Sequence, residues 1–260
     1  MKQFDVVVIG GGPGGYVAAI RASQLGKNVA LVEAQHLGGI CLNWGCIPTK
    51  ALLRSAEMFH LANHMSEFGI EVSNIKFDLA KIVERSRAVS SQLASGIKAL
   101  MKKNKVTVFD GYGSIAKDKI INIDNKGEKS SIKASNIIIA TGARARILPG
   151  YEPDGKLVLT YREAMVPTQM PKSLIIVGSG AIGIEFASFY KTLGAEVTVV
   201  EAQDRILPVE DKEISDLARK SFEKQGINFI TSAKLGKLTK HKDSVELEVE
   251  GHKALKADRI

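Results

Sequence analysis

The sequence predicts an α/β protein made of two similar halves, each with a parallel β-sheet and a β-meander. Two observations predict this. A glycine-rich motif occurs at residues 10–15 and again at residues 178–183, an offset of 168 residues. Each copy stands between two short β-branched runs, and the second run ends in a glutamate 23 residues after the first glycine of its motif. We therefore expect one domain over residues 1–147 and another over residues 148–260.

The composition is that of a globular protein. Of the 260 residues, 45% are hydrophobic and 25% are charged, which is too apolar for a disordered chain. No apolar run reaches the roughly 18–20 residues that a membrane helix needs. The four-residue apolar run near the amino terminus is also too short for the core of a signal peptide. We therefore expect a cytoplasmic protein with no membrane contact.

The formal net charge of +8 raises the question of a nucleic-acid partner, because a basic face attracts phosphate. The lysines are spread along the chain, however, and most alternate with acidic residues. The densest basic patches, at residues 102–105 and 237–242, are typical of helix ends and solvated loops. We expect no nucleic-acid partner.

Each copy of the repeat predicts a strand, a turn, a helix and a second strand. Residues 6–9 and 174–177 are continuous apolar runs, as in buried parallel strands. Small residues such as Ala19 and Ala187 follow the turns and let each helix lie close to its sheet. The residues that define the two copies are Gly10, Gly12, Gly15 and Glu33 in the first and Gly178, Gly180, Gly183 and Glu201 in the second.

This arrangement is the pattern of a Rossmann-like dinucleotide-binding domain. The first glycine turns the chain, the second admits a pyrophosphate, and the third lets helix and strand pack closely. The helix N-terminus offers N–H groups to phosphate, and the acid accepts hydrogen bonds from ribose hydroxyls. Two purely structural glycine turns are the plainer alternative, but the full pattern occurs twice. In the second copy, Glu201 suits a free 2′-hydroxyl and favours NAD over NADP, whereas the nearby Arg205 points weakly the other way.

Two cysteines, Cys41 and Cys46, stand five positions apart between the copies. In a regular helix such residues have Cα atoms beyond ~7 Å and point to different sides, so a disulfide requires an irregular segment. Gly45 is where the chain can bend, and Pro48 suits the first turn of a following helix. A redox-active disulfide is favoured over a zinc half-site or two buried free cysteines, because no further cysteine and no histidine spacing completes a metal set. We expect no metal.

The remaining segments connect these motifs. Residues 77–104 predict a long helix with an apolar stripe packed in the core, and residues 106–140 predict a β-meander with a turn at residues 125–127. Residues 144–155, with two prolines and two glycines, predict the linker between the domains. The stripe of the long helix consists of Ile82, Val89, Leu93, Ile97, Leu100 and Met101.

The cysteine segment, Gly38-Gly-Ile-Cys-Leu-Asn-Trp-Gly-Cys-Ile-Pro-Thr-Lys50, resembles the pyridine nucleotide-disulfide oxidoreductases. The resemblance covers essentially the whole chain. The pairs Leu42-Asn43 and Ile47-Pro48 are more similar to the members that oxidise dihydrolipoamide than to the glutathione or mercuric reductases. Further marks of the family are Gly111-Tyr112-Gly113 and Ala140-Thr141-Gly142.

The resemblance implies FAD in the first domain, NAD in the second, and a role for each matching residue. Cys41 would exchange thiols with dihydrolipoamide, and Cys46 would face the flavin as a thiolate donor. Lys50 would lie near the flavin and pair with Glu185, since an unpaired buried lysine is costly. The FAD residues would be Gly10, Gly12, Gly15, Glu33, Gly39, Lys50, Gly113, Thr141 and Gly142, and the NAD residues Gly178, Gly180, Gly183 and Glu201.

The resemblance also implies partners. Members that oxidise dihydrolipoamide take it from the lipoyl domains of 2-oxo-acid dehydrogenase complexes and form homodimers. This chain would correspond to roughly their first half. The FAD domain would lack its later segment, and the NAD domain, inserted in it, would be truncated. The dimer-interface domain with its His-Glu acid–base pair would be absent. Two alternatives are a related FAD/NAD(P) disulfide reductase with another substrate and a non-catalytic nucleotide-binding remnant.

Overall fold

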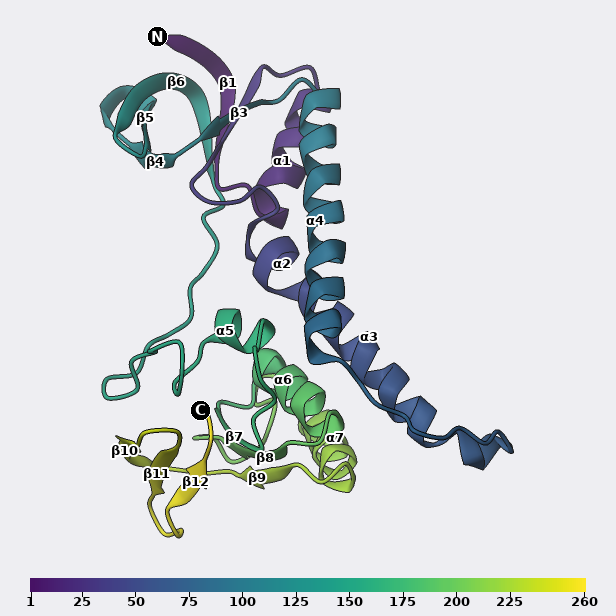
Figure 1. The fold of residues 1–260 in the computed structure, drawn as a ribbon. Coiled ribbons are helices and arrows are strands. Elements are labelled where there is room, and N and C mark those ends of the chain that lie inside the picture. The colour runs from purple at the N-terminus through teal and green to yellow at the C-terminus, as the bar shows by residue number, and fades with distance from the viewer. The chain divides into compact units, whose positions relative to one another are not determined.

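The computed structural model describes all 260 residues, which form two compact units (Figure 1). Unit 1 comprises Met1–Pro48 and Ser86–Arg144, and unit 2 comprises Thr49–Arg85 and Ala145–Ile260. The assignment of residues 1–147 and 148–260 to one cofactor each concerns function and stays a prediction.

Unit 1 is built on a six-stranded sheet of order β3-β2-β1-β6-β5-β4. The first four strands in this order run parallel to one another, and β5 and β4 continue the sheet as an antiparallel meander. The turn between β5 and β6 is made by Lys126 and Gly127, both with positive φ, as a tight hairpin requires. The strands are β1 (Lys2–Ile9), β2 (Val29–Glu33), β3 (Thr107–Asp110), β4 (Tyr112–Ile115), β5 (Ile120–Asn125) and β6 (Glu128–Ile139).

Successive side chains of β1 point to opposite faces of the sheet, and residues on both faces are buried. Val8 packs with Ala19 of α1 and Met101 of α4, while Val7 and Ile9 pack with residues of the meander. Figure 1 shows α1 and α4 together on one side of this sheet. The two apolar layers explain why β1 is a continuous apolar run in the sequence. Unit 1 contains the helices α1 (Pro13–Gln24) and α2 (Gly39–Trp44), the first residues of α3 (Cys46–Asn63) and the part of α4 (Leu79–Lys103) from Ser86 onward.

The buried face of α4 differs from the predicted apolar stripe. Ile97 and Met101 are buried as expected, but Leu93 and Leu100 are 42% and 41% exposed. Ser86 and Ser90 are buried instead, with 0% and 2% of their surface exposed. The stripe is therefore wrong at Leu93 and Leu100, and in the first half of the helix the fully buried positions are serines, while Ile82 and Val89 are half-buried.

Unit 2 repeats the first-unit pattern in its sheet of β7 (Ser173–Val177), β8 (Glu196–Val200) and β9 (Asn228–Ile230). These strands are parallel and in that order. A separate antiparallel meander follows, made of β10 (Leu235–Lys240), β11 (Val245–Val249) and β12 (Leu255–Ala257). The helices of this unit are α5 (Tyr161–Met165), α6 (Ala181–Thr192) and α7 (Lys212–Lys224), and two short 3-10 helices lie at Met65–Phe68 and Lys117–Lys119 of the chain.

The core of unit 2 lies between its sheet and its meander. Ile175 and Val200 of the sheet pack against Val245, Leu247 and Val249 of β11, which alternate with glutamates that point outward. Figure 1 shows α6 and α7 on the other side of the sheet. The expected strand–turn–helix–strand order and the expected meander in each half are both confirmed. None of the helices is both long enough and apolar enough to cross a bilayer.

Candidate functional site

The two glycine turns have the same hydrogen bonds. Gly10 follows β1 and donates its N–H to Val32 O at 2.8 Å, and Gly178 follows β7 and donates to Val200 O at 2.8 Å. The turns lead into α1 and α6, whose N-caps are Gly12 and Gly180. Neither N-terminus has a side-chain cap or an acid in its first turn. Each helix therefore presents N–H groups and a partial positive charge that no side chain of its own satisfies.

The third glycine of each motif lies so close to the backbone that no side chain fits there. A Cβ atom on Gly15 would overlap the carbonyl oxygen of Gly10, and one on Gly183 would overlap that of Gly178. Gly180 is different, since a Cβ there would meet no atom within 4 Å. The space in front of Gly180 is open, which is what the approach of a pyrophosphate requires.

The two glutamates turn back onto the glycine turns. Glu33 accepts the N–H of Gly11 at 2.6 Å through Oε2. Glu201 accepts both the N–H and the hydroxyl of Ser179 through Oε2, at 2.8 and 2.7 Å, and the N–H of Gln203 through Oε1 at 2.8 Å. Burial acts to raise the pKa of Glu201, but the hydrogen bonds from Ser179, Gln203 and Ala202 outweigh it and lower that pKa below its usual value.

Several predicted FAD residues meet at one edge of the unit 1 sheet. Gly39 lies so close to the first turn that a Cβ on it would be 2.6 Å from Gly12 Cα. A Cβ on Gly113 would be 3.1 Å from the side chain of Val32 and 3.3 Å from that of Ile9. Ile9 is the last residue of β1, and Val32 is the second-last residue of β2. Thr141 and Gly142 follow the end of β6 after one intervening residue, and a Cβ on Gly10 would lie 3.1 Å from Thr141 Cα.

This geometry fits a dinucleotide in each unit. An uncapped helix N-terminus, an open glycine approach and a nearby carboxylate are the donor and acceptor set that a pyrophosphate and a ribose need. In unit 2 all three are present at Gly180, α6 and Glu201. No group of three or more histidine, cysteine, aspartate and glutamate side chains gathers as a metal site.

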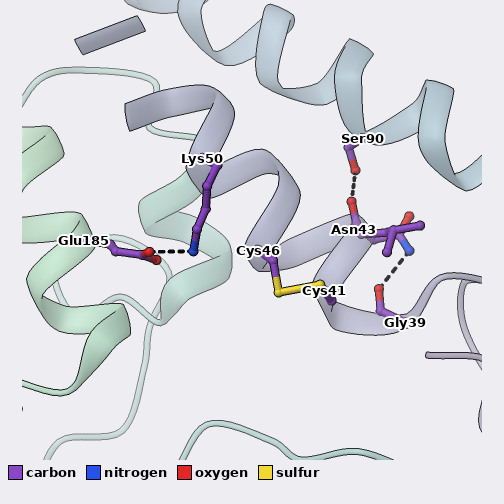
Figure 2. Close-up of a disulfide and its surroundings, with 8 residues drawn as sticks. Gly39, Cys41, Asn43, Cys46, Lys50, Ser90 and Glu185 are labelled. Carbon is purple, nitrogen blue, oxygen red and sulfur yellow. Dashed lines mark hydrogen bonds and ion pairs between the residues drawn. A yellow bond between two sulfur atoms is a disulfide. The ribbon is translucent and has the colours of Figure 1, made fainter. Parts of the chain in front are cut away.

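A disulfide joins Cys41 of α2 to Cys46, the first residue of α3 (Figure 2). Their Cα atoms are 4.7 Å apart. The helix is broken between them at Gly45, whose φ of −145° and ψ of −118° lie outside the helical region. The predicted bend and the favoured disulfide are both confirmed, and neither cysteine is free. Cys46 is exposed and Cys41 is half-buried.

Two residues of α4, neither of them predicted as functional, contact the end of α2. The Ser90 hydroxyl donates to Leu42 O, and Arg87 Nη2 donates to Asn43 O. Arg87 also lies over the Trp44 ring, with its guanidinium carbon 4.6 Å from the ring centroid. Burial lowers the pKa of Arg87. The sequence held a weak indication of this contact, namely serines at helical spacing in α4.

Lys50 and Glu185 form an ion pair within unit 2 (Figure 2). Lys50 Nζ is 2.5 Å from Glu185 Oε1, as the expected pairing requires. The Lys50 side chain is 61% exposed, however, so the expectation of a buried lysine is wrong for this structure. Lys50 is the fifth residue of α3, which faces solvent at this position.

Comparison with known proteins adds to this geometry. A curated dihydrolipoyl dehydrogenase from Rhizobium etli is 53% identical over 266 residues, which cover 96% of this chain and 55% of the relative. The crystal structure of LpdA from Mycobacterium tuberculosis matches with a TM-score of 0.90 at 28% identity, covering all of this chain and 57% of that one. The HOCl-induced flavoprotein disulfide reductase RclA from Escherichia coli matches with a TM-score of 0.84 at 27% identity, over 100% and 56% of the two chains.

This chain thus spans about half the length of the curated relatives it matches. A family model described as pyridine nucleotide-disulphide oxidoreductase matches residues 4–260, which include both glycine turns and the disulfide. The chain therefore belongs to the pyridine nucleotide-disulphide oxidoreductase family.

Proposed function

We propose that the protein is a flavoprotein that oxidises dihydrolipoamide to lipoamide and passes the electrons to NAD⁺. The observation that carries this proposal is the Cys41–Cys46 disulfide, held across the bend at Gly45 directly after the segment that meets the first glycine turn at Gly39. The names of the curated relatives support the substrate. The chain spans about half of the length of these relatives, and we propose the same activity for it.

The first step is thiol–disulfide exchange on the chain's own sulfur atoms. A thiolate of dihydrolipoamide attacks Sγ of Cys41, the Cys41–Cys46 bond breaks, and Cys46 leaves as a thiolate. Cys46 is the better leaving group because it begins α3, an 18-residue helix whose N-terminus stabilises negative charge. The second thiol of the substrate then displaces Cys41, which releases lipoamide and leaves a reduced cysteine pair. Two electrons and two protons are transferred in total.

The residues at the two sheet edges would hold the cofactors. Gly10, Gly12, Gly15, Glu33, Gly39, Gly113, Thr141 and Gly142 would bind FAD, and Gly178, Gly180, Gly183 and Glu201 would bind NAD. The chemistry that bound FAD supplies is two-electron transfer between a dithiol and NAD⁺. Glu201 would select NAD, since a carboxylate accepts hydrogen bonds from a free 2′-hydroxyl and repels a 2′-phosphate. Lys50 would lie near the flavin, with Glu185 fixing its ammonium group.

The remaining expectations belong to the same proposal. Residues 1–147 would form the FAD domain and residues 148–260 the NAD domain. The substrate would be presented on the lipoyl domains of a 2-oxo-acid dehydrogenase complex in the cytoplasm, by a homodimer.

The test uses the fact that the chain has two cysteines only. The protein is incubated with FAD, gel-filtered, exposed to dihydrolipoamide and then alkylated. We expect retained FAD and two alkylated thiols per chain, and in the Cys46→Ser variant no long-wavelength absorption from a thiolate against flavin. Retained disulfide after exposure to dihydrolipoamide would contradict the proposed substrate.

A related disulfide reductase with another substrate is the second candidate, supported by the structural match to RclA. The same alkylation experiment with glutathione in place of dihydrolipoamide separates the two. Opening of the disulfide by glutathione at lower concentration than by dihydrolipoamide would favour this candidate. A chain that retains neither FAD nor NADH would be a non-catalytic remnant.

A further inference from the structure

We propose that Arg87 and Ser90 are positioning residues of the redox pair. By capping the carbonyl end of α2, they keep Cys41 beside Cys46 in the reduced protein and so make the reduction potential of the pair more negative. This inference rests on the proposed redox function and adds residues to it that lie on another helix.

Helix α2 is too short to hold its own geometry. It has six residues, Gly39–Trp44, and is flanked by two glycines, the N-cap Gly38, which provides no side-chain hydrogen bond, and the C-cap Gly45. The last four carbonyl groups of a helix have no partner within it, and a helix of this length is marginal in water. Leu42 and Asn43 are among the residues whose carbonyls need partners from elsewhere.

Helix α4 supplies these partners. The Ser90 hydroxyl donates to Leu42 O, and Arg87 Nη2 donates both to Asn43 O and, at 2.9 Å, to Ser90 Oγ. Ser90 therefore accepts one bond and donates another, which closes a connected network in a buried place. The contact of Arg87 with the Trp44 ring, at 4.6 Å from the centroid, fixes the plane of the guanidinium.

The N-terminal end of α2 is held by a side chain of the same helix. The Asn43 carboxamide Nδ2 donates to Gly39 O at 2.9 Å and to Leu37 O at 3.2 Å, as Figure 2 shows for Gly39. Cys41 lies between the two fixed ends. The bonds from Arg87 and Ser90 to the carbonyls of Asn43 and Leu42 thus hold the backbone of Cys41 next to Cys46.

We call the contacts of Arg87 and Ser90 with the carbonyls of Asn43 and Leu42 the clamp. The clamp changes the redox equilibrium by acting on the reduced state. Reduction by glutathione consumes two glutathione molecules, gives two cysteine thiols and releases one glutathione disulfide. Thiols that stay close together re-form their disulfide more readily than thiols that can separate. Loss of the clamp should therefore lower the equilibrium constant for disulfide formation by three- to tenfold, and a tenfold change in this two-electron couple is about 29.6 mV.

The test measures this equilibrium constant in the complete chain, by alkylation and mass spectrometry after incubation in glutathione redox buffers. Ser90→Ala is compared with Ser91→Ala, the adjacent exposed serine of the same helix, and Arg87→Gln with Lys98→Gln, an exposed cation of α4. We expect a three- to tenfold fall for Ser90→Ala and Arg87→Gln and no change for the two control variants. Unchanged constants in both clamp variants, or equal shifts in the controls, would overturn the proposal.

A second measurement covers variants that lose stability as a whole. Hydrogen exchange of the reduced protein should become faster at the amides of α2 in Ser90→Ala and stay unchanged at those of α1. If α1 also exchanges faster, Arg87→Lys replaces that variant, because it keeps the charge but loses the planar fork. A failure of the proposed function is distinct: dihydrolipoamide would then leave the wild-type disulfide closed, whatever the glutathione equilibrium shows.

Discussion

Ser179 donates two hydrogen bonds to the same oxygen atom of Glu201, from its N–H at 2.8 Å and from its hydroxyl at 2.7 Å. The matching residue in unit 1 is Gly11, which donates one bond to Glu33. The hydroxyl is therefore the difference between the two turns. It ties the second acid to its turn more firmly and favours the carboxylate over the carboxylic acid.

Ser179→Ala should destabilise unit 2 by about 2 kcal/mol at pH 7, because it removes a hydrogen bond to a charged group. The lowered pKa of Glu201 means that this stabilisation is present above the usual carboxyl range and is lost as the pH falls through the folded-state pKa. Urea unfolding at pH 7, 5 and 3.5 measures the difference, and Ser188→Ala is the control. A difference that does not shrink with acid would contradict the role of the hydroxyl.

Glu201→Arg should raise affinity for NADPH relative to NADH at least tenfold, about 1.4 kcal/mol, because it replaces a charge that repels the 2′-phosphate with one that attracts it. Fluorescence titration with both nucleotides gives the ratio. Glu33→Arg, at the matching position of unit 1, is the control and should leave the ratio unchanged. An identical change in both variants would remove the ribose assignment.

Gly183→Ala and Gly180→Ala should have different effects. The first places a Cβ against the carbonyl oxygen of Gly178 and should destabilise the protein by about 1–3 kcal/mol. The second places a Cβ in open space and should change stability by less than about 1 kcal/mol, yet weaken NADH binding. Thermal unfolding and NADH titration separate the two effects. Equal NADH affinity in Gly180→Ala and wild type would show that no pyrophosphate approaches there.

Asp154→Asn should destabilise unit 2 by about 2 kcal/mol at pH 7. Asp154 accepts the N–H groups of Lys156, Leu157 and Val158 at 2.8–3.0 Å and the ammonium group of Lys240 at 2.9 Å. Burial acts against the charged form, but Lys240 and these N–H groups hold the pKa of Asp154 far below its usual value. The difference between variant and wild type should therefore be constant above about pH 5 and decrease in stronger acid. Unfolding titrations over this pH range are the measurement.

Lys50 and Glu185 should contribute little to stability, because the lysine is largely exposed. A double-mutant cycle with Lys50→Met and Glu185→Gln should give a coupling energy below about 1 kcal/mol. The cycle uses urea unfolding, and Lys212→Met with Asp216→Asn, an exposed pair on α7, gives the comparison value. A coupling of several kcal/mol would mean that the pair is shielded from solvent in solution.

The elements near the glycine motifs could be predicted from the sequence because their causes are local. A β-branched run next to Gly10, a bend next to Gly45 and positive φ at Gly127 each depend on a few neighbouring residues. The polar face of α4 depends instead on what lies opposite it. Ser90 is buried because the carbonyl end of α2 needs donors, and that end is more than 40 residues away in the sequence.

The same separation explains the error about Lys50. Its partner Glu185 lies 135 residues further along the chain, and the family resemblance supplied the pairing without the exposure. The roles of the individual cofactor residues stay predictions, although apart from Lys50, which belongs to unit 2, the members of each set lie near one edge of their own sheet.

The contact between α2 and α4 also has a consequence for folding. The bonds from Arg87 and Ser90 close loops of 44 and 48 residues, and closing a flexible loop of that length costs roughly 3 kcal/mol of chain entropy. Short-range turns and hairpins are favoured to form before such a contact. The disulfide joins cysteines only five positions apart and can therefore form before the long helix docks, so that the docking of α4 onto the carbonyl end of α2 is among the later steps that complete unit 1.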